Sequence, residues 1–179
     1  MTDKKRKNSA KLYVTVFCSA CLLLLYVLIF SFSDQDGETS GSLSALVAEK
    51  CVAFLHSFTG GNWSEVMRAE LALYFENPIR KMAHFAEYAV MGVLLTVLWA
   101  QWLKRGVRFY FLVILWVFIS AAADEIHQLF VPGRYGCFAD VILDTFGGIF
   151  GMMLVRLILV LPYPTAEYLN NEESFHDST

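Results

Sequence analysis

The stretch Asp124-Glu125-Ile126-His127-Gln128 places two acids, an imidazole and an amide within about one and a half helical turns. It follows the apolar run 109–123, which contains no charged residue. At 1.5 Å per residue this run rises only about 22 Å, whereas the hydrocarbon core of a bilayer is roughly 30 Å thick. A spanning helix must therefore continue to about residue 130 and carry the polar stretch into the membrane. Ionisable groups at that depth are costly, so they are candidates for a functional site.

The composition supports a membrane protein. Of the 179 residues, 56% are hydrophobic and 17% are charged, and the mean hydropathy is +0.49. A soluble domain is rarely so apolar, whereas a small polytopic membrane protein usually is. The sequence has no P-loop and no dinucleotide-binding fingerprint. The sequence leaves any cofactor unknown, and no nucleic-acid partner is expected.

The apolar segments predict an all-α fold in which four helices span the membrane. The spans are expected at about 12–30, 86–103, 109–130 and 140–161. The first run is longer than the apolar part of a typical signal peptide, and no A-x-A site follows it, so we interpret it as a membrane helix. We expect the membrane domain over 12–161, a basic amino-terminal segment over 1–11 and a mobile tail over 162–179.

The segment between the first two spans is expected to lie outside the membrane. Apolar residues recur at helical spacing over 43–58, which predicts an amphipathic helix on the bilayer surface or over the bundle. A second short helix is expected over 63–76. Asn77 and Pro78 then form a helix-start signal, an N-cap residue followed by proline, so the next helix is predicted from Pro78 to about Leu103.

Basic residues predict the orientation. They cluster in 1–11, in the turn 104–108, and near the end of the fourth span at Arg156. The positive-inside rule makes this side cytoplasmic, so both termini are expected in the cytoplasm. The polar residues of the second, third and fourth spans then gather at the outer end.

Four cysteines are present. Cys18 and Cys21 lie in the first apolar run and are interpreted as small core residues. Cys51 and Cys137 are both expected outside the membrane, and the spacing leaves open whether they are bonded.

Helical spacing indicates which polar groups face one another. Asp124, His127 and Gln128 are three and four residues apart and are expected on one face, with Glu125 about 100° away. Asp140 and Asp144 form a stripe that continues through glycines, which allow close helix packing. We therefore predict one outward-opening cavity whose ligand-binding residues are Lys81, His84, Glu87, Asp124, Glu125, His127, Gln128, Arg134, Asp140 and Asp144.

Three interpretations of this set of residues are open. Arg80, Lys81 and Arg134 could hold a phosphate or carboxylate, while the catalytic candidates His127, Asp124 and Glu125 handle protons. A metal could instead bind His84, His127 and Asp140. In the third interpretation the charges pair with one another and lock the helices together. Four or more acids exceed what such a lock needs, which favours a ligand site.

Several motifs together resemble the VanZ-like family, and their order along the chain is specific. They are Lys81-Met82-Ala83-His84-Phe85-Ala86-Glu87-Tyr88, the stretch 124–128, Pro132-Gly133-Arg134, and Asp140 and Asp144 before a glycine-rich helix. Ser33-Asp34-Gln35 and the segment 40–44 add to the likeness. The chain departs from the family pattern at Asp144, where asparagine is common, so a scheme that needs a neutral amide there is in doubt.

The resemblance implies a small bacterial protein of the cytoplasmic membrane, because the founding member of the family is tied to teicoplanin resistance. It also implies a role at the outer face, near lipid-linked cell-wall chemistry. The expected partners are the lipid bilayer and a glycopeptide or lipid-linked precursor. An intramembrane hydrolase or transferase acting on a phosphorylated lipid is the second hypothesis, and a structural partner in a membrane complex is the third.

Overall fold

The computed structural model describes residues 3–35, 37–60 and 62–160. In these residues the chain forms five helices and no strand. The helices are α1 (Asp3–Ser33), α2 (Gly37–Thr59), α3 (Glu65–Trp99), α4 (Val107–Gln128) and α5 (Phe138–Val160).

Four of these helices are long and apolar enough to cross a membrane. The qualifying segments are Asn8–Ser33, Glu65–Trp99, Val107–Gln128 and Phe138–Ile158. Large apolar side chains on their outer faces are exposed, as at Phe17, Phe111 and Phe146, and lipid would cover such faces. The predicted all-α membrane fold is therefore confirmed. The expected tail 162–179 lies outside the described residues.

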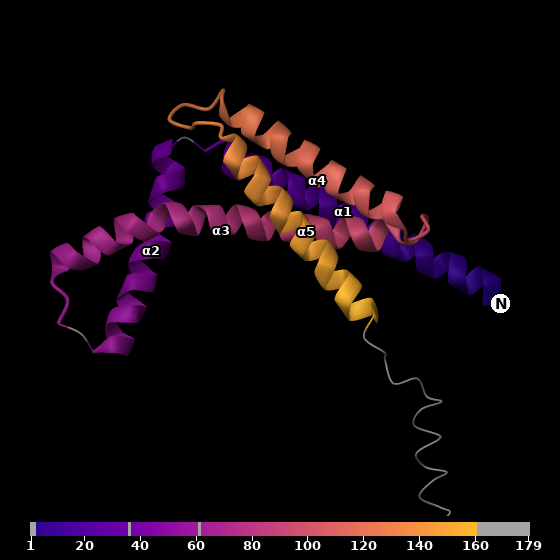
Figure 1. Ribbon diagram of the computed structural model, residues 1–179, viewed down its shortest axis with the longest axis horizontal. Helices are drawn as coiled ribbons and strands as arrows, with labels where there is room; N and C mark the ends of the chain where they lie inside the picture. The colour runs from indigo at the N-terminus through magenta and orange to yellow at the C-terminus, as the bar shows by residue number, and fades with distance from the viewer. Residues whose placement is uncertain (1–2, 36, 61, 161–179) are drawn as a thin grey trace, which may run out of the picture.

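The helix start predicted at Pro78 is wrong, because α3 begins at Glu65 and continues through Pro78. Ser64 caps α3 instead, accepting a hydrogen bond from the backbone N–H of Met67 at 3.2 Å. The segment expected as a separate helix over 63–76 is thus the first part of α3. Proline inside a helix removes one backbone hydrogen bond and favours a bend, and α3 bends between α2 and the bundle (Figure 1). The packing of α3 on α2 and on the bundle therefore keeps the helix continuous, although the Asn77-Pro78 pair locally favours a helix start.

The length of α3 allows it to pack on α2 with its first part and in the four-helix bundle with its later part. Its 35 residues extend about 52 Å, far more than the roughly 30 Å of a bilayer core. The first part packs on α2, where Ala48 and Val52 of α2 and Ala72 of α3 form a small buried cluster. The later part enters the four-helix bundle (Figure 1).

The predicted amphipathic helix exists as α2, but its large apolar face does not pack on α3. Leu43, Leu46, Phe54 and Phe58 are all exposed, whereas the neighbouring face bearing Ser44, Ala48 and Val52 is buried. Small side chains let α2 approach α3 closely, and the larger apolar residues remain on the outside. That exposed face is suited to contact with lipid.

The bundle core is formed by α1, α3, α4 and α5. Its fully buried members include Ile29 of α1, Tyr88 and Met91 of α3, and Val113 and Val117 of α4. α1 and α4 are further joined by polar contacts, since Trp116 Nε1 donates to the Tyr26 hydroxyl at 2.9 Å.

Glycines bring α3 and α5 into backbone contact. A Cβ added at Gly92 would collide with the backbone of Gly148, and one at Gly151 would collide with the carbonyl of Ala89. Gly147 packs in the same way on the backbone of Phe85. Because Gly147 and Gly151 follow Asp140 and Asp144 along α5, the contact turns that acidic face toward α3, as the small-residue stripe predicted.

The end of the bundle where α1 and α4 end and α5 begins is called the cavity end below. α3 ends and α4 begins at the opposite end (Figure 1). All four cysteines are unbonded, and Cys51 and Cys137, whose pairing the spacing left open, are both exposed.

Replacing Gly151 tests the backbone contact. Gly151→Val is expected to destabilise the protein by about 1–3 kcal/mol, because the added side chain meets a backbone carbonyl that cannot rotate away. The measurement is the thermal midpoint of the purified protein in detergent. Gly106→Ala is the control, because a Cβ there meets nothing within 4 Å. The contact would be unimportant if Gly151→Val unfolded at the same midpoint as Gly106→Ala.

Candidate functional site

An ion pair joins α3 to the start of α5 at the cavity end. Lys81 Nζ donates to Asp140 Oδ1, and both side chains are partly buried. Lys81 comes from α3 and Asp140 from the first turn of α5, so this pair fixes the two helices where their glycine contact ends. A charge-assisted hydrogen bond of this kind is stronger than a neutral one.

Glu125 of α4 holds the first residues leading into α5. Its Oε2 accepts a hydrogen bond from the backbone N–H of Cys137 at 2.7 Å, and its side chain is buried. A carboxylate is well placed there, since free N–H groups and the helix dipole favour negative charge at a helix start. Gly136 allows this approach, because a Cβ there would lie 2.5 Å from the Glu125 carbonyl oxygen.

Asp124 and Gln128 form a buried pair on the next turn of α4. Gln128 Nε2 donates to Asp124 Oδ2 at 3.1 Å and to the Ser33 hydroxyl of α1 at 3.3 Å. Asp124 is fully buried, and its Oδ1 makes no hydrogen bond. The predicted shared face of Asp124 and Gln128 is therefore present, and it also contacts α1.

Arg134, on the turn between α4 and α5, reaches the end of α1. Its Nη2 donates to the carbonyl of Phe32 at 2.7 Å and its Nε donates to the carbonyl of Gln35 at 3.1 Å. Cations suit helix carboxyl ends, where carbonyl groups lack helical partners. Burial and the positive charge of Arg80 lower the pKa of the Arg134 guanidinium, but arginine remains charged at neutral pH.

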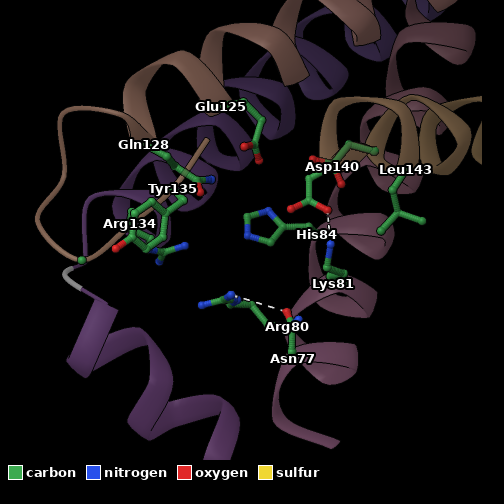
Figure 2. Close-up of a pocket in the computed structure, with 12 residues that line it drawn as sticks. Asn77, Arg80, Lys81, His84, Glu125, Gln128, Arg134, Tyr135, Asp140 and Leu143 are labelled. Carbon is green, nitrogen blue, oxygen red and sulfur yellow. Dashed lines mark hydrogen bonds and ion pairs between the residues drawn. The ribbon is translucent and has the colours of Figure 1, made fainter. Parts of the chain in front are cut away.

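These side chains surround a cavity of about 100 Å³, called the polar cavity below. Figure 2 shows the imidazole of His84 between Glu125 on α4 and Arg80 on α3. Arg80 and Arg134 extend toward the same space (Figure 2). The lining residues are Asn77, Arg80, Lys81, His84, Glu125, Gln128, Gly133, Arg134, Tyr135, Asp140, Leu143 and Asp144.

The charges of the polar cavity are only partly neutralised within the protein. Lys81 pairs with Asp140 as the helix-lock interpretation requires. In the described part of the chain, however, neither Arg80 nor Arg134 has a carboxylate within ion-pair distance. Arg80 makes one weak hydrogen bond, to Asn77 Oδ1 at 3.5 Å. Two guanidinium groups at one cavity, neither with a described carboxylate partner, favour a site for an anion over a structural lock.

Asp144 adds a buried carboxyl group to the lining of the polar cavity, and His84 of that lining lies near Glu87. Asp144 is 1% exposed, and neither of its carboxylate oxygens has a hydrogen-bond partner. His84 Nδ1 lies 3.7 Å from Glu87 Oε2, which is too long for a hydrogen bond, and both atoms are buried. The cavity thus combines guanidinium groups with carboxyl groups and an imidazole, which are the groups that bind phosphate and transfer protons.

His127, which helical spacing placed on one face with Asp124 and Gln128, is not among the residues that line the polar cavity. Its Nε2 lies 3.5 Å from Asp34 Oδ1, and its ring packs edge-on against Phe30 of α1. Successive helical residues are about 100° apart, so Glu125 and His127 point about 160° away from each other. Since Glu125 faces the cavity, His127 faces α1.

The other predicted site residues divide into three groups. Lys81, His84, Glu125, Gln128, Arg134, Asp140 and Asp144 line the polar cavity. Asp124 is buried beside it through Gln128, and Glu87 lines a neighbouring compartment described below. The metal candidates His84, His127 and Asp140 are not brought together. In residues 3–35, 37–60 and 62–160 no group of three or more His, Cys, Asp or Glu is arranged to hold a metal ion.

Sequence reasoning missed Asn77, Leu143 and Tyr135 as lining residues. Asn77 lies three residues before Arg80, on the same face of α3, whereas the Asn77-Pro78 pair in the sequence favours a helix cap. Had α3 been predicted as continuous, helical spacing would have placed Asn77 with Arg80 and Lys81. No local signal placed Tyr135 in the cavity wall.

Fold and site together define a polytopic membrane protein with a charged cavity at one end of its helical bundle. A family model described as VanZ/LLP1 matches residues 18–159, a range that contains every residue lining the polar cavity. The chain therefore belongs to the VanZ/LLP1 family, which confirms the resemblance seen in its motifs. No curated protein and no solved structure matches the chain.

Two substitutions at Glu125 test whether its carboxylate secures the start of α5. Glu125→Leu is expected to cost about 1–3 kcal/mol, because the partly buried hydrogen bond from the N–H of Cys137 loses its acceptor. Glu125→Gln keeps an acceptor oxygen and should cost clearly less. Thermal midpoints in detergent compare the two variants with the wild type. If both variants lowered the midpoint equally, the hydrogen bond to Cys137 would not be what stabilises the turn.

Proposed function

We propose that this VanZ/LLP1-family protein binds an anionic headgroup in the polar cavity, at the outer face of the bacterial cytoplasmic membrane. The observation that carries the proposal is the pair of guanidinium groups, Arg80 and Arg134, that line one cavity without a carboxylate partner in the described residues. Arginine binds phosphate and carboxylate through paired N–H donors, and burial strengthens such bonds.

The distribution of basic residues supports the outward orientation. Lys4, Lys5, Arg6, Lys7 and Lys11 belong to the start of α1, and Lys104, Arg105 and Arg108 lie where α3 leads into α4. Both clusters are at the end of the bundle opposite the cavity (Figure 1). The positive-inside rule assigns that end to the cytoplasm, so both termini are cytoplasmic and the cavity faces outward.

The size of the cavity supports a small headgroup as the bound group. About 100 Å³ accommodates a phosphate or a few water molecules, whereas a glycopeptide antibiotic is far larger. We therefore favour a lipid-linked cell-wall precursor over the glycopeptide itself as the ligand. An altered supply or presentation of that precursor would then change teicoplanin susceptibility, the trait to which the family resemblance points.

Arg80→Gln tests the proposal, because Arg80 has no ion pair to lose among the residues that the structure describes. The binding of a long-chain alkyl phosphate to purified protein in nanodiscs is expected to weaken about tenfold or more, since a hydrogen bond to a charged group contributes about 1.5–3 kcal/mol. Arg108→Gln, at an exposed arginine at the opposite end of the bundle, should bind as the wild type does.

The same variants can be compared in cells. Expressed in a teicoplanin-susceptible bacterium, the wild type and Arg108→Gln should shift the inhibitory concentration equally, and Arg80→Gln should shift it less. Equal phosphate binding by Arg80→Gln and Arg108→Gln would refute the proposed anion site.

The second candidate function is an intramembrane hydrolase or transferase acting on a phosphorylated lipid. The observation that favours it is His84, whose imidazole lies in the polar cavity beside Glu87 and between Arg80 and Glu125 (Figure 2). In this arrangement His84, and not His127, would act as the acid or base. The two arginines would hold the phosphate.

His84→Asn separates binding from chemistry. If the protein is an enzyme, phosphate release from a phosphorylated lipid should fall at least a hundredfold while the lipid remains bound, which is typical for loss of a general acid or base. His127→Asn should leave turnover near the wild-type rate. Absence of phosphate release by the wild type, or equal rates for all three proteins, would leave binding as the function.

A further inference from the structure

A second, apolar compartment adjoins the polar cavity. Its volume is about 160 Å³, and it lies between the end of α1, the first turns of α2 and the middle of α3. Its apolar lining consists of Phe32 from α1, Leu43 and Val47 from α2, and Ile79 and Ala83 from α3. The complete lining also includes Gln35, Ser44, Arg80, His84, Glu87 and Arg134.

The two compartments share a charged wall. Arg80, His84 and Arg134 line both of them. Arg134 also hydrogen-bonds the carbonyls of Phe32 and Gln35, so the residue that contributes to the polar cavity also holds one edge of the apolar compartment. A ligand bound at these guanidinium groups would therefore have apolar side chains beside its anionic group.

We infer that the ligand of the proposed headgroup site is an amphiphile, a lipid phosphate whose hydrocarbon chain lies in the compartment between α1, α2 and α3. This inference rests on the proposed function, because the phosphate is placed at Arg80 and Arg134. A free phosphate or a soluble sugar phosphate would leave the apolar compartment without a role. A lipid phosphate has both parts that the joined compartments match.

The exposed face of α2 supports a route from the bilayer. Leu43 and Val47 are 52% and 39% exposed although they line the compartment, so the apolar lining is open on that side. Phe54 and Phe58 continue the exposed apolar face along α2. Such a face is stable next to lipid, so a chain could enter from the membrane without crossing water.

A photoreactive lipid tests this placement. The probe is a long-chain alkyl phosphate with a diazirine in its chain, added to the full-length protein in phosphatidylcholine nanodiscs. The alcohol with the same chain, which lacks the phosphate, is the comparison probe. After illumination, the phosphate probe is expected to label peptides containing Leu43, Val47 and Ile79 at least fivefold more than the alcohol does. An excess of unlabelled alkyl phosphate should remove this labelling.

Two tryptophan variants of α2 form a matched pair. Leu43→Trp places a large ring in the compartment and should reduce the labelling severalfold. Leu46→Trp, at a leucine of similar exposure (48%) on the same helix but outside the compartment, should leave it unchanged. Val47→Trp provides a second blocking variant, and the thermal midpoint of each protein shows whether it is folded.

The outcomes distinguish the two proposals. If Arg80→Gln weakens binding but labelling is spread over the lipid-facing sides of α4 and α5 and is equal in Leu43→Trp and Leu46→Trp, the chain does not lie in the compartment and only the headgroup site stands. If the phosphate probe and the alcohol label the wild type equally, and Arg80→Gln changes nothing, the headgroup proposal itself is wrong. Labelling confined to the compartment and blocked by Leu43→Trp supports both.

Discussion

The backbone contact between α3 and α5 is the constraint on which the rest of the structure depends. Gly92, Gly147 and Gly151 leave no room for a Cβ between the two helices. Such an approach replaces side-chain packing with backbone packing, which is favourable inside a membrane because apolar side chains gain little there by leaving lipid. Since helix positions follow from this contact, Asp140 and Asp144 of α5 face α3 instead of lipid. The Lys81–Asp140 pair then forms about two helical turns before Gly147 along α5.

The polar cavity arises because this close pair meets α4 and the end of α1 at one level. Glu125 holds the beginning of α5, and Gln128 joins Asp124 to Ser33 of α1. Arg134 closes the arrangement by binding carbonyl groups at the end of α1. Each of these interactions satisfies a backbone or carboxylate group that would be costly to leave unpaired at this depth. Arg80 stands apart, because its charge has no carboxylate partner in the described chain. This charge without a described carboxylate partner is the basis of the proposed anion site.

The position of α2 adds an apolar compartment beside the polar cavity. α2 packs on α3 through small side chains, which keeps the helices close and leaves its large apolar residues facing outward. Its first turns therefore contribute apolar lining right next to the two arginines. None of the residues that line the polar cavity belongs to α2, whereas Leu43 and Val47 of α2 line the apolar compartment. The juxtaposition of guanidinium groups and an open apolar compartment is the observation on which the proposed lipid phosphate site rests.

The sequence by itself determined the membrane class, the four spans, the family motifs and the gathering of polar residues at one end, because hydropathy, basic residues and helical spacing are local properties. It also predicted the acidic stripe of α5, since glycines at the same spacing mark a close contact. Two features could not be obtained this way. Pro78 carries a strong helix-start signal, yet packing of α3 on both α2 and the bundle holds one helix through it. His127 and Glu125 are equally plausible from spacing alone, because the pattern fixes only the angle between them. Only the contacts of α4 with α1 on one side and α5 on the other decide that Glu125 faces the cavity and His127 faces Asp34.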